Sequence, residues 1–181
     1  MLGMSVWAFM YGLEIFFPTL PAKLLVIKFE YIGIVIIPVF LFIFALEFTG
    51  RSNLLLPRVR FLLGIFPAII LLMVWTNEYH HLMWIVQGLI EGNGISLLDA
   101  QYGVFFWLHV GFSYTLVFLS GLILVMELLQ KPGVYRIHIA LVILGISSPV
   151  LGNILFVSGS DLIQHLDVTP LFFIPTAIAL G

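Results

Sequence analysis

Residues 50–60, GRSNLLLPRVR, form a basic connection between two long apolar runs. A second basic connection, with Lys131 and Arg136, follows a later apolar run, and the two connections together hold five of the seven Lys and Arg residues. The intervening connections at residues 78–99 and 161–167 contain acidic residues but no Lys or Arg. Because basic loops of multispanning membrane proteins stay in the cytoplasm, this alternation predicts a polytopic membrane protein with both basic loops inside.

The composition excludes a soluble globule. Of the 181 residues, 62% are apolar and 9% are charged, and the mean hydropathy is +1.19, which leaves too little polar surface to face water. The net charge of -2 offers no basic surface for nucleic acid, and the absence of Cys removes disulfides and thiolate chemistry. We therefore expect the surface of the protein to contact the lipid bilayer. Without Cys, the candidate side chains for binding an ion are those of His, Asp and Glu.

The apolar runs predict an all-α bundle. A helix needs roughly 20 apolar residues to cross about 30 Å of hydrocarbon. By that length, six spans are predicted, at residues 1–17, 24–49, 58–76, 103–129, 135–158 and 169–181. We expect residues 1–181 to form one transmembrane domain. The first predicted span begins within apolar sequence and the last one ends within it, so we expect this domain to be a fragment truncated at both ends. With the basic loops inside, the C-terminus is expected to be cytoplasmic.

One predicted helix presents a face of small residues. Gly145, Ser148, Gly152 and Gly159 recur at spacings of three, four and seven in the fifth run, where they permit another helix to approach closely. Asn153 beside them is a polar group at moderate depth. We expect these residues to serve helix packing, with Asn153 forming a hydrogen bond across helices.

The connection at residues 77–102 predicts a β-hairpin. Residues 91–94, Glu-Gly-Asn-Gly, are a strong turn signal between the β-compatible runs 82–90 and 95–98. Apolar residues in a water-facing loop need a surface to pack on, so we expect the hairpin to fold as an extracellular lid over the outer mouth of the bundle. A short interfacial helix is the alternative.

Ionisable groups within the predicted spans indicate function, because each costs several kcal/mol to place in hydrocarbon. Glu14 and Glu30 both fall in the outer half of the membrane. Glu30 could instead pair with Lys28 or form a hydrogen bond to a neighbouring helix.

Histidines gather in the same outer layer. His80, His81 and His109 lie near it, and His165 is close to Asp167 in the last outer connection. Together with the carboxylates they could bind a divalent metal or change protonation near neutral pH. No helix has an HxxxH or HExxH spacing, so we assign no metal ligand. His109 lies on one predicted helix face with Ser113, Ser120 and Glu127.

Aromatic residues flank the outer boundary. Trp75, Trp84 and Trp107 fit the aromatic belt of membrane proteins. Trp84 and Trp107 could instead line a small-molecule pocket under the hairpin, since such pockets combine flat aromatic groups with a few polar ones.

Several motifs, in order, resemble one known family. Residues 7–14 (WAFMYGLE), 29–33 (FEYIG), 46–51 (LEFTGR), 76–84 (TNEYHHLMW), 103–109 (GVFFWLH) and 167–171 (DVTPL) look like successive segments of the seven-transmembrane sensor domain N-terminal to prokaryotic histidine kinases. The resemblance covers nearly the whole chain. It implies that one N-terminal helix of the seven is missing here, that the domain is not catalytic, and that a cytoplasmic kinase or cyclase module follows in cis.

The sequence thus predicts a sensory input domain for an extracellular or membrane-borne ligand, an ion or pH. A small transporter or channel is the second hypothesis, and an intramembrane enzyme the third. No cofactor is identified, the ligand is an unnamed small molecule or ion, and a homodimer is compatible with the sequence. The candidate ligand-binding residues are Glu14, Glu30, Asn77, His80, His81, Trp84, Trp107, His109 and Asp167.

Overall fold

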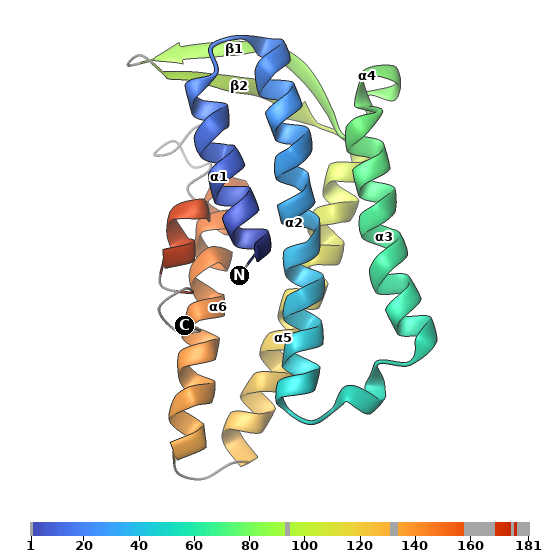
Figure 1. Cartoon of the computed structure of the whole chain (residues 1–181), viewed down its shortest axis with the longest axis vertical. Coiled ribbons are helices and arrows are strands. Elements are labelled where there is room, and N and C mark those ends of the chain that lie inside the picture. The colour runs from blue at the N-terminus through green and yellow to red at the C-terminus, as the bar shows by residue number, and fades with distance from the viewer. Residues whose placement is uncertain (1, 93–94, 131–133, 158–168, 175, 177–181) are drawn as a thin grey trace.

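The computed structural model describes residues 2–92, 95–130, 134–157, 169–174 and 176 (Figure 1). These residues are mostly helical, and they include one small sheet. The elements are α1 (Leu2–Phe16), α2 (Leu20–Phe48), η1 (Ser52–Leu54), α3 (Pro57–Trp75), α4 (Asn77–His80), β1 (Trp84–Gly92), β2 (Ile95–Tyr102), α5 (Val104–Gln130), α6 (Val134–Val157) and η3 (Thr169–Phe172).

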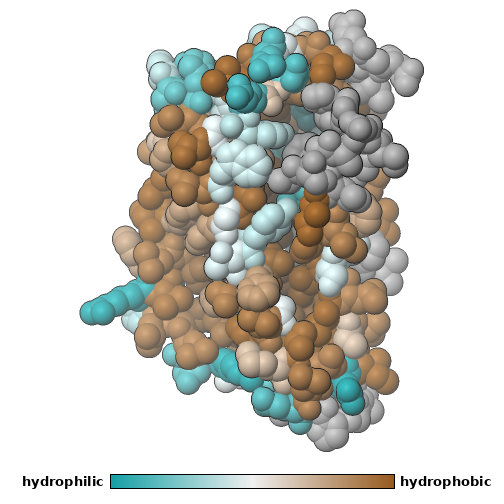
Figure 2. All heavy atoms as spheres, turned by 180° about the vertical axis from the view of Figure 1, so that it is seen from behind, coloured by the Kyte–Doolittle hydropathy of each residue, from teal (hydrophilic) through white to brown (hydrophobic). Residues whose placement is uncertain are grey.

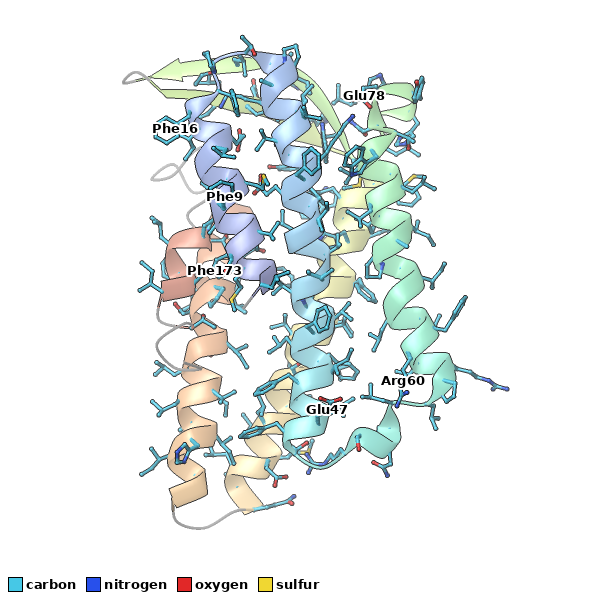
Figure 3. The ribbon with its side chains drawn as sticks, in the orientation of Figure 1. Phe9, Phe16, Glu47, Arg60, Glu78 and Phe173 are labelled. Carbon is cyan, nitrogen blue, oxygen red and sulfur yellow. The ribbon has the colours of Figure 1, made fainter. Side chains whose placement is uncertain are left out.

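The long helices run along the longest axis of the molecule, and the sheet lies across one end (Figure 1). We call this end the hairpin end. The opposite end, which we call the arginine end, holds Arg51, Arg58 and Arg60 in and after the connection between α2 and α3. Figure 3 shows Glu47 and Arg60 at the arginine end and Glu78 at the hairpin end.

Four described helices are long and apolar enough to cross a membrane: α2, α3, α5 and residues Arg136–Ile154 of α6. Figure 2 shows hydrophobic residues around the middle of the molecule and hydrophilic ones gathered at its two ends. The helix predicted at residues 1–17 is present as α1, but its 15 residues rise about 22 Å, which is less than the thickness of the hydrocarbon layer. Of the predicted span at 169–181, residues 169–174 and 176 are described, and Thr169–Phe172 form the short 3-10 helix η3.

Helix α2 is the centre of the fold. Three clusters of buried apolar side chains follow one another along the bundle, and α2 contributes Tyr31 and Val35 to the first, Val39 and Leu46 to the second and Ala45 to the third. A helix that is apolar all round is expected to be enclosed by other helices. Neighbouring helices α1, α3 and α5 all pack against α2.

The predicted hairpin is confirmed, and the alternative of an interfacial helix at residues 84–102 is wrong. Strands β1 and β2 pair antiparallel from Trp84 opposite Tyr102 to Gly92 opposite Ile95, with an irregularity between Val86 and Gly88. The predicted turn residues 93–94 lie outside the described residues. The second strand extends to Tyr102, beyond the four residues that the sequence indicated.

The small residues of α6 face the segment that includes η3. A Cβ atom at Gly152 would lie 2.7 Å from the Phe172 ring, and the Thr176 hydroxyl donates a hydrogen bond to the carbonyl of Gly145. The Asn153 side-chain oxygen accepts a hydrogen bond of 2.7 Å from the Tyr114 hydroxyl of α5. Ser148 is half-buried, and Gly159 lies outside the described residues.

Helix α1 packs on α2 through a glycine contact. A Cβ atom at Gly33 would lie 2.5 Å from the carbonyl oxygen of Gly3 and 2.8 Å from the backbone nitrogen of Trp7. Both of these are backbone atoms, which cannot rotate away as a side chain does. Gly33 is therefore required for the present spacing of the two helices.

We predict that Gly33→Ala destabilises the protein, because the methyl group must push α1 away from α2. Overpacking of this kind costs about 1–3 kcal/mol. The matched control is Gly64→Ala in α3, where a Cβ atom meets nothing within 4 Å. The purified protein is heated to a series of temperatures, and the fraction that stays folded is measured by size-exclusion chromatography. The midpoint temperature of unfolding should be lower for Gly33→Ala and unchanged for Gly64→Ala. Equal midpoints for the two variants would contradict the glycine contact.

Candidate functional site

A large, partly open cavity lies between four helices and the hairpin. Its volume is about 1260 Å³, and its walls come from α1, α2, α5 and α6, with Trp84 and residues of β2 at the hairpin end. Four of the predicted site residues line it: Glu14, Glu30, Trp84 and His109. Toward the arginine end the lining changes to Phe44, Phe48 and His138. The polar candidates thus meet in the half of the cavity next to the hairpin.

Glu14 is positioned by a buried lysine. The Lys23 side chain is fully buried at the start of α2, and its Nζ donates a hydrogen bond of 2.6 Å to the carbonyl oxygen of Glu14. The same Nζ lies 3.6 Å from the Glu14 carboxylate. A buried cation requires such partners. Lys23 was missed as a site residue because the sequence presents it as the polar start of an apolar run, and its contact depends on the turn between α1 and α2.

Glu30 and His109 approach the cavity from α2 and α5. Both side chains are buried, at 5% exposure each. The Tyr31 ring links them to the hairpin, since its centroid lies 5.4 Å from the Trp84 ring and 6.1 Å from the His109 ring. The His109 Nδ1 atom is 3.4 Å from the Ser113 hydroxyl, one turn along α5. An aromatic wall therefore joins three elements around these polar groups.

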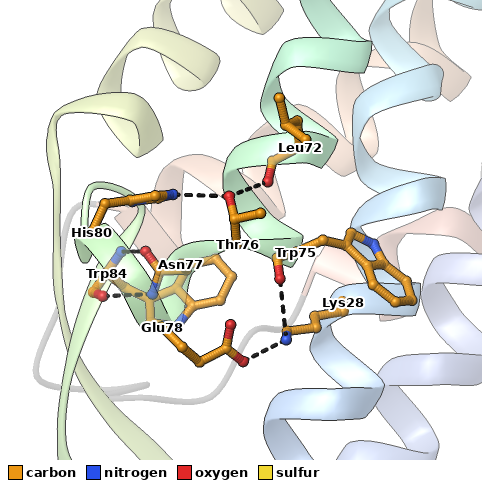
Figure 4. Close-up of polar contacts among 8 residues, drawn as sticks. All are labelled: Lys28, Leu72, Trp75, Thr76, Asn77, Glu78, His80 and Trp84. Atoms are coloured by element: carbon orange, nitrogen blue, oxygen red, sulfur yellow. Dashed lines mark hydrogen bonds and ion pairs between the residues drawn. The ribbon is translucent and has the colours of Figure 1, made fainter.

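Lys28 does not pair with Glu30 as one sequence interpretation allowed. Its ammonium group instead pairs with the carboxylate of Glu78 and lies 3.4 Å from the carbonyl oxygen of Trp75, so it joins α2 to the end of α3 and to α4 (Figure 4). The Lys28 ammonium also holds the pKa of Glu78 below its usual value. A lowered carboxylate pKa means that this pair stabilises the fold at neutral pH and loses its contribution as the pH falls through that lowered value.

Asn77 anchors the first strand of the hairpin. Its side-chain oxygen accepts hydrogen bonds from the backbone N–H groups of Met83, at 2.9 Å, and Trp84, at 3.4 Å. Its amide nitrogen donates a hydrogen bond of 2.8 Å to the carbonyl of Trp84 (Figure 4). Asn77 is buried. These bonds satisfy both ends of the side chain, so its role in this structure is to fix the hairpin and not to face the cavity.

His80 and His81 also belong to the connection and not to the cavity lining. His80 Nε2 lies 3.1 Å from the Thr76 hydroxyl (Figure 4). Its Nδ1 accepts a hydrogen bond of 3.0 Å from the backbone N–H of Leu82. His81 has a φ of 56°, the left-handed conformation that ends α4. His80 and His81 were both predicted as ligand-binding candidates, and the structure places them at the end of α4, before β1, and not among the residues that line the cavity.

Of the remaining candidates, Trp107 lies apart from the cavity lining. Trp107 is half-exposed, and its ring packs edge-on against Phe106 at a centroid distance of 5.3 Å. Asp167 lies outside the described residues. Within the described part of the chain, no three His, Asp or Glu side chains come together in a way that could hold a metal ion.

A second residue missed by sequence reasoning is Trp7 of α1. It lines the cavity and packs edge-on against Phe173 at a centroid distance of 5.1 Å. Its buried indole N–H has no hydrogen-bond partner among the described residues. A tryptophan in an apolar run resembles ordinary core packing, so the sequence gives no signal for this position.

The arginine end joins α5 to the connection after α2. The Arg51 guanidinium lies 3.4 Å from the Glu127 carboxylate and donates a hydrogen bond of 3.3 Å to the carbonyl of Ile123. Glu127 belongs to the predicted α5 stripe, whose members His109, Ser120 and Glu127 are all buried. One face of α5 thus extends from the cavity to this ion pair.

We predict that Asn77→Ala loosens the hairpin without unfolding the helices, because three hydrogen bonds at the start of β1 are lost together. Leaving buried backbone groups without partners costs about 1–3 kcal/mol. Amide hydrogen exchange of Met83, Trp84 and β2 should accelerate. The control Asn53→Ala removes an exposed asparagine of η1 and should leave this exchange unchanged. Unaltered amide exchange in Asn77→Ala would contradict the role of Asn77 in fixing the hairpin.

Comparison with known proteins places the chain in a family. No curated protein and no solved structure matches it. A family model described as the N-terminal 7TM region of histidine kinase matches residues 1–181, and this region does not include a kinase catalytic domain. The apolar helices and the match agree that this is a membrane protein. The chain therefore belongs to the family of N-terminal seven-transmembrane regions of histidine kinases.

Proposed function

We propose that this chain is a sensory input domain that binds a ligand in the cavity below the hairpin and transmits a helix movement to the arginine end. The observation that supports this most is the position of Glu14, Glu30 and His109 in the wall of one cavity. Carboxylates in a membrane span are costly to bury, and they commonly mark binding sites or ion pathways. The cavity is large enough for a small-molecule ligand, whose sites commonly measure about 300–1,000 Å³.

The hairpin serves as a lid in this proposal. Its β2 residues line the cavity, and Asn77 and the Lys28–Glu78 pair fix its base to α2 and α3. Polar anchoring outside the apolar middle lets the strands adjust over a ligand while the helices stay packed.

The relay uses α2 and α5. Both helices line the cavity, and the Arg51–Glu127 pair connects the end of α2 with α5 at the opposite end. A ligand shifts an equilibrium between two arrangements only when it binds one of them more tightly. A ligand that contacts Glu30 and His109 together can do so, because its affinity depends on the relative position of these two helices.

We place the arginine end in the cytoplasm and the hairpin outside, following the distribution of Lys and Arg. A movement at the arginine end is then delivered to the side of the membrane where a kinase module in cis would lie. This arrangement gives the ligand access from outside or from the outer half of the bilayer.

A transporter or channel is a weaker candidate. The cavity does reach Phe48 and His138 near the arginine end. Its lining, however, is mostly apolar, and side chains such as Ile37, Leu41 and Val142 offer no coordination to a passing ion.

We predict that the purified domain retains a small molecule and that Glu30→Gln reduces its occupancy. The substitution keeps the side-chain volume and removes a charge from the cavity wall. Native mass spectrometry of protein in nanodiscs, with the molecules released by collisional activation, measures the occupancy. Glu47→Gln, an exposed carboxylate outside the cavity, is the matched control. Equal occupancy in both variants would contradict a ligand role for Glu30.

We also predict the sidedness of the two ends. The chain has no Cys, so single cysteines at Ser52 and Gln87, both exposed, are unique labels for the arginine end and the hairpin. In intact cells a membrane-impermeant maleimide should label Gln87→Cys and spare Ser52→Cys, and permeabilised cells should show labelling of both. Labelling of Ser52→Cys in intact cells would reverse the proposed topology.

A further inference from the structure

We propose that the ligand of this cavity is a cationic amphiphile, with an organic ammonium group near the hairpin and a hydrocarbon tail directed toward the arginine end. This inference rests on the proposed function and names the chemical class of the ligand. Three properties of the cavity lead to it: the sign of its charges, the aromatic groups beside them, and the apolar stripe that continues from them.

The charges in the cavity wall favour a cation. Among the described lining residues there are two carboxylates, Glu14 and Glu30, and no Lys or Arg. Lys23, which is buried behind the wall, balances Glu14. With both carboxylates ionised, the three groups together have one net negative charge in a low-dielectric region. An anionic ligand would be repelled there, whereas a cation is attracted.

The aromatic groups favour an ammonium over a metal ion. Tyr31 and Trp84 line the cavity beside Glu30, and the stacked rings of Tyr102 and Phe106 form another part of the wall, with a centroid distance of 3.8 Å. Ring faces attract organic cations through their quadrupoles, and this attraction is stronger when water is excluded. The oxygen ligands that a hard metal ion needs are few here by comparison.

The face of α2 that lines the cavity suits a hydrocarbon tail. Glu30 belongs to a stripe on α2 with alternating spacings of three and four, and all its members line the cavity: Ile27, Glu30, Ile34, Ile37, Leu41, Phe44 and Phe48. Such spacing keeps the residues on one helix face. The helix rises about 21 Å from Glu30 to Phe44, so a single apolar wall extends from the carboxylate along most of the bundle.

The test compares three probes that share an eight-carbon tail and differ in head-group charge: octyltrimethylammonium, octyl glucoside and octyl sulfate. Protein in nanodiscs of a neutral galactolipid is dialysed against an equimolar mixture, and bound probe is quantified after subtraction of empty discs. We expect the cation to exceed each of the other two by roughly tenfold, the size of a desolvated cation–aromatic contact.

Two variants test whether the preference for the cationic probe arises in the cavity. Glu30→Gln should abolish the preference for the cation, whereas the exposed control Glu47→Gln should retain it. Leu41→Trp, which narrows the tail region, should lower the binding of all three probes and serves as the second test if Glu30→Gln fails to fold.

The outcomes separate the two proposals. Equal binding of the three probes, or a preference for octyl sulfate, overturns the cationic ligand and leaves a binding cavity in place. No specific binding of any probe overturns both the ligand class and the proposed function. A cation preference that survives in Glu30→Gln contradicts the assignment of Glu30 as the recognising group.

Discussion

The structure depends on one constraint, which is that hydrocarbon offers no hydrogen-bond partner to a polar group. Four polar side chains of the described helices accordingly turn inward: Glu30, His109, Ser120 and Glu127 are all buried. Helix α2 packs against α1, α3 and α5, and these contacts form much of the interior that the polar groups share. The positions of the polar groups and the packing of the helices are therefore two results of the same cause.

At the two ends of the molecule, polar side chains attach the connections to the helices. At the hairpin end, the connection between α3 and β1 must reverse direction and present a strand, and Asn77 supplies hydrogen bonds to backbone groups that neither a helix nor the sheet satisfies. The Lys28–Glu78 pair attaches this connection to α2. At the arginine end, the ion pair between Arg51 and Glu127 attaches the connection after α2 to α5. The apolar middle determines the packing, and the polar ends determine which helices are tied together.

Local patterns predicted the elements well. The 82–98 hairpin followed from its turn signal, and the four long helices followed from apolar run length. Depth in the span correctly singled out Glu30 and His109 as buried groups. The pairing of Lys23 with Glu14 and of Lys28 with Glu78 could not be predicted, because each depends on how a turn brings distant residues together. The same reason explains His80 and His81, whose position near the outer layer suggested a site although the turn uses them locally.

The most direct test of the account is a distance measurement across the arginine end. Nitroxide labels on Ser52→Cys and Leu129→Cys, in a chain that has no other Cys, report the separation of the connection after α2 from the end of α5. Double electron–electron resonance in nanodiscs, with and without saturating octyltrimethylammonium, gives the distance distribution in each state. If the cavity is coupled to this end, the probe shifts the distribution by roughly 1–2 Å, the size of helix shifts in known switches. An unchanged distribution with probe demonstrably bound would contradict the coupling.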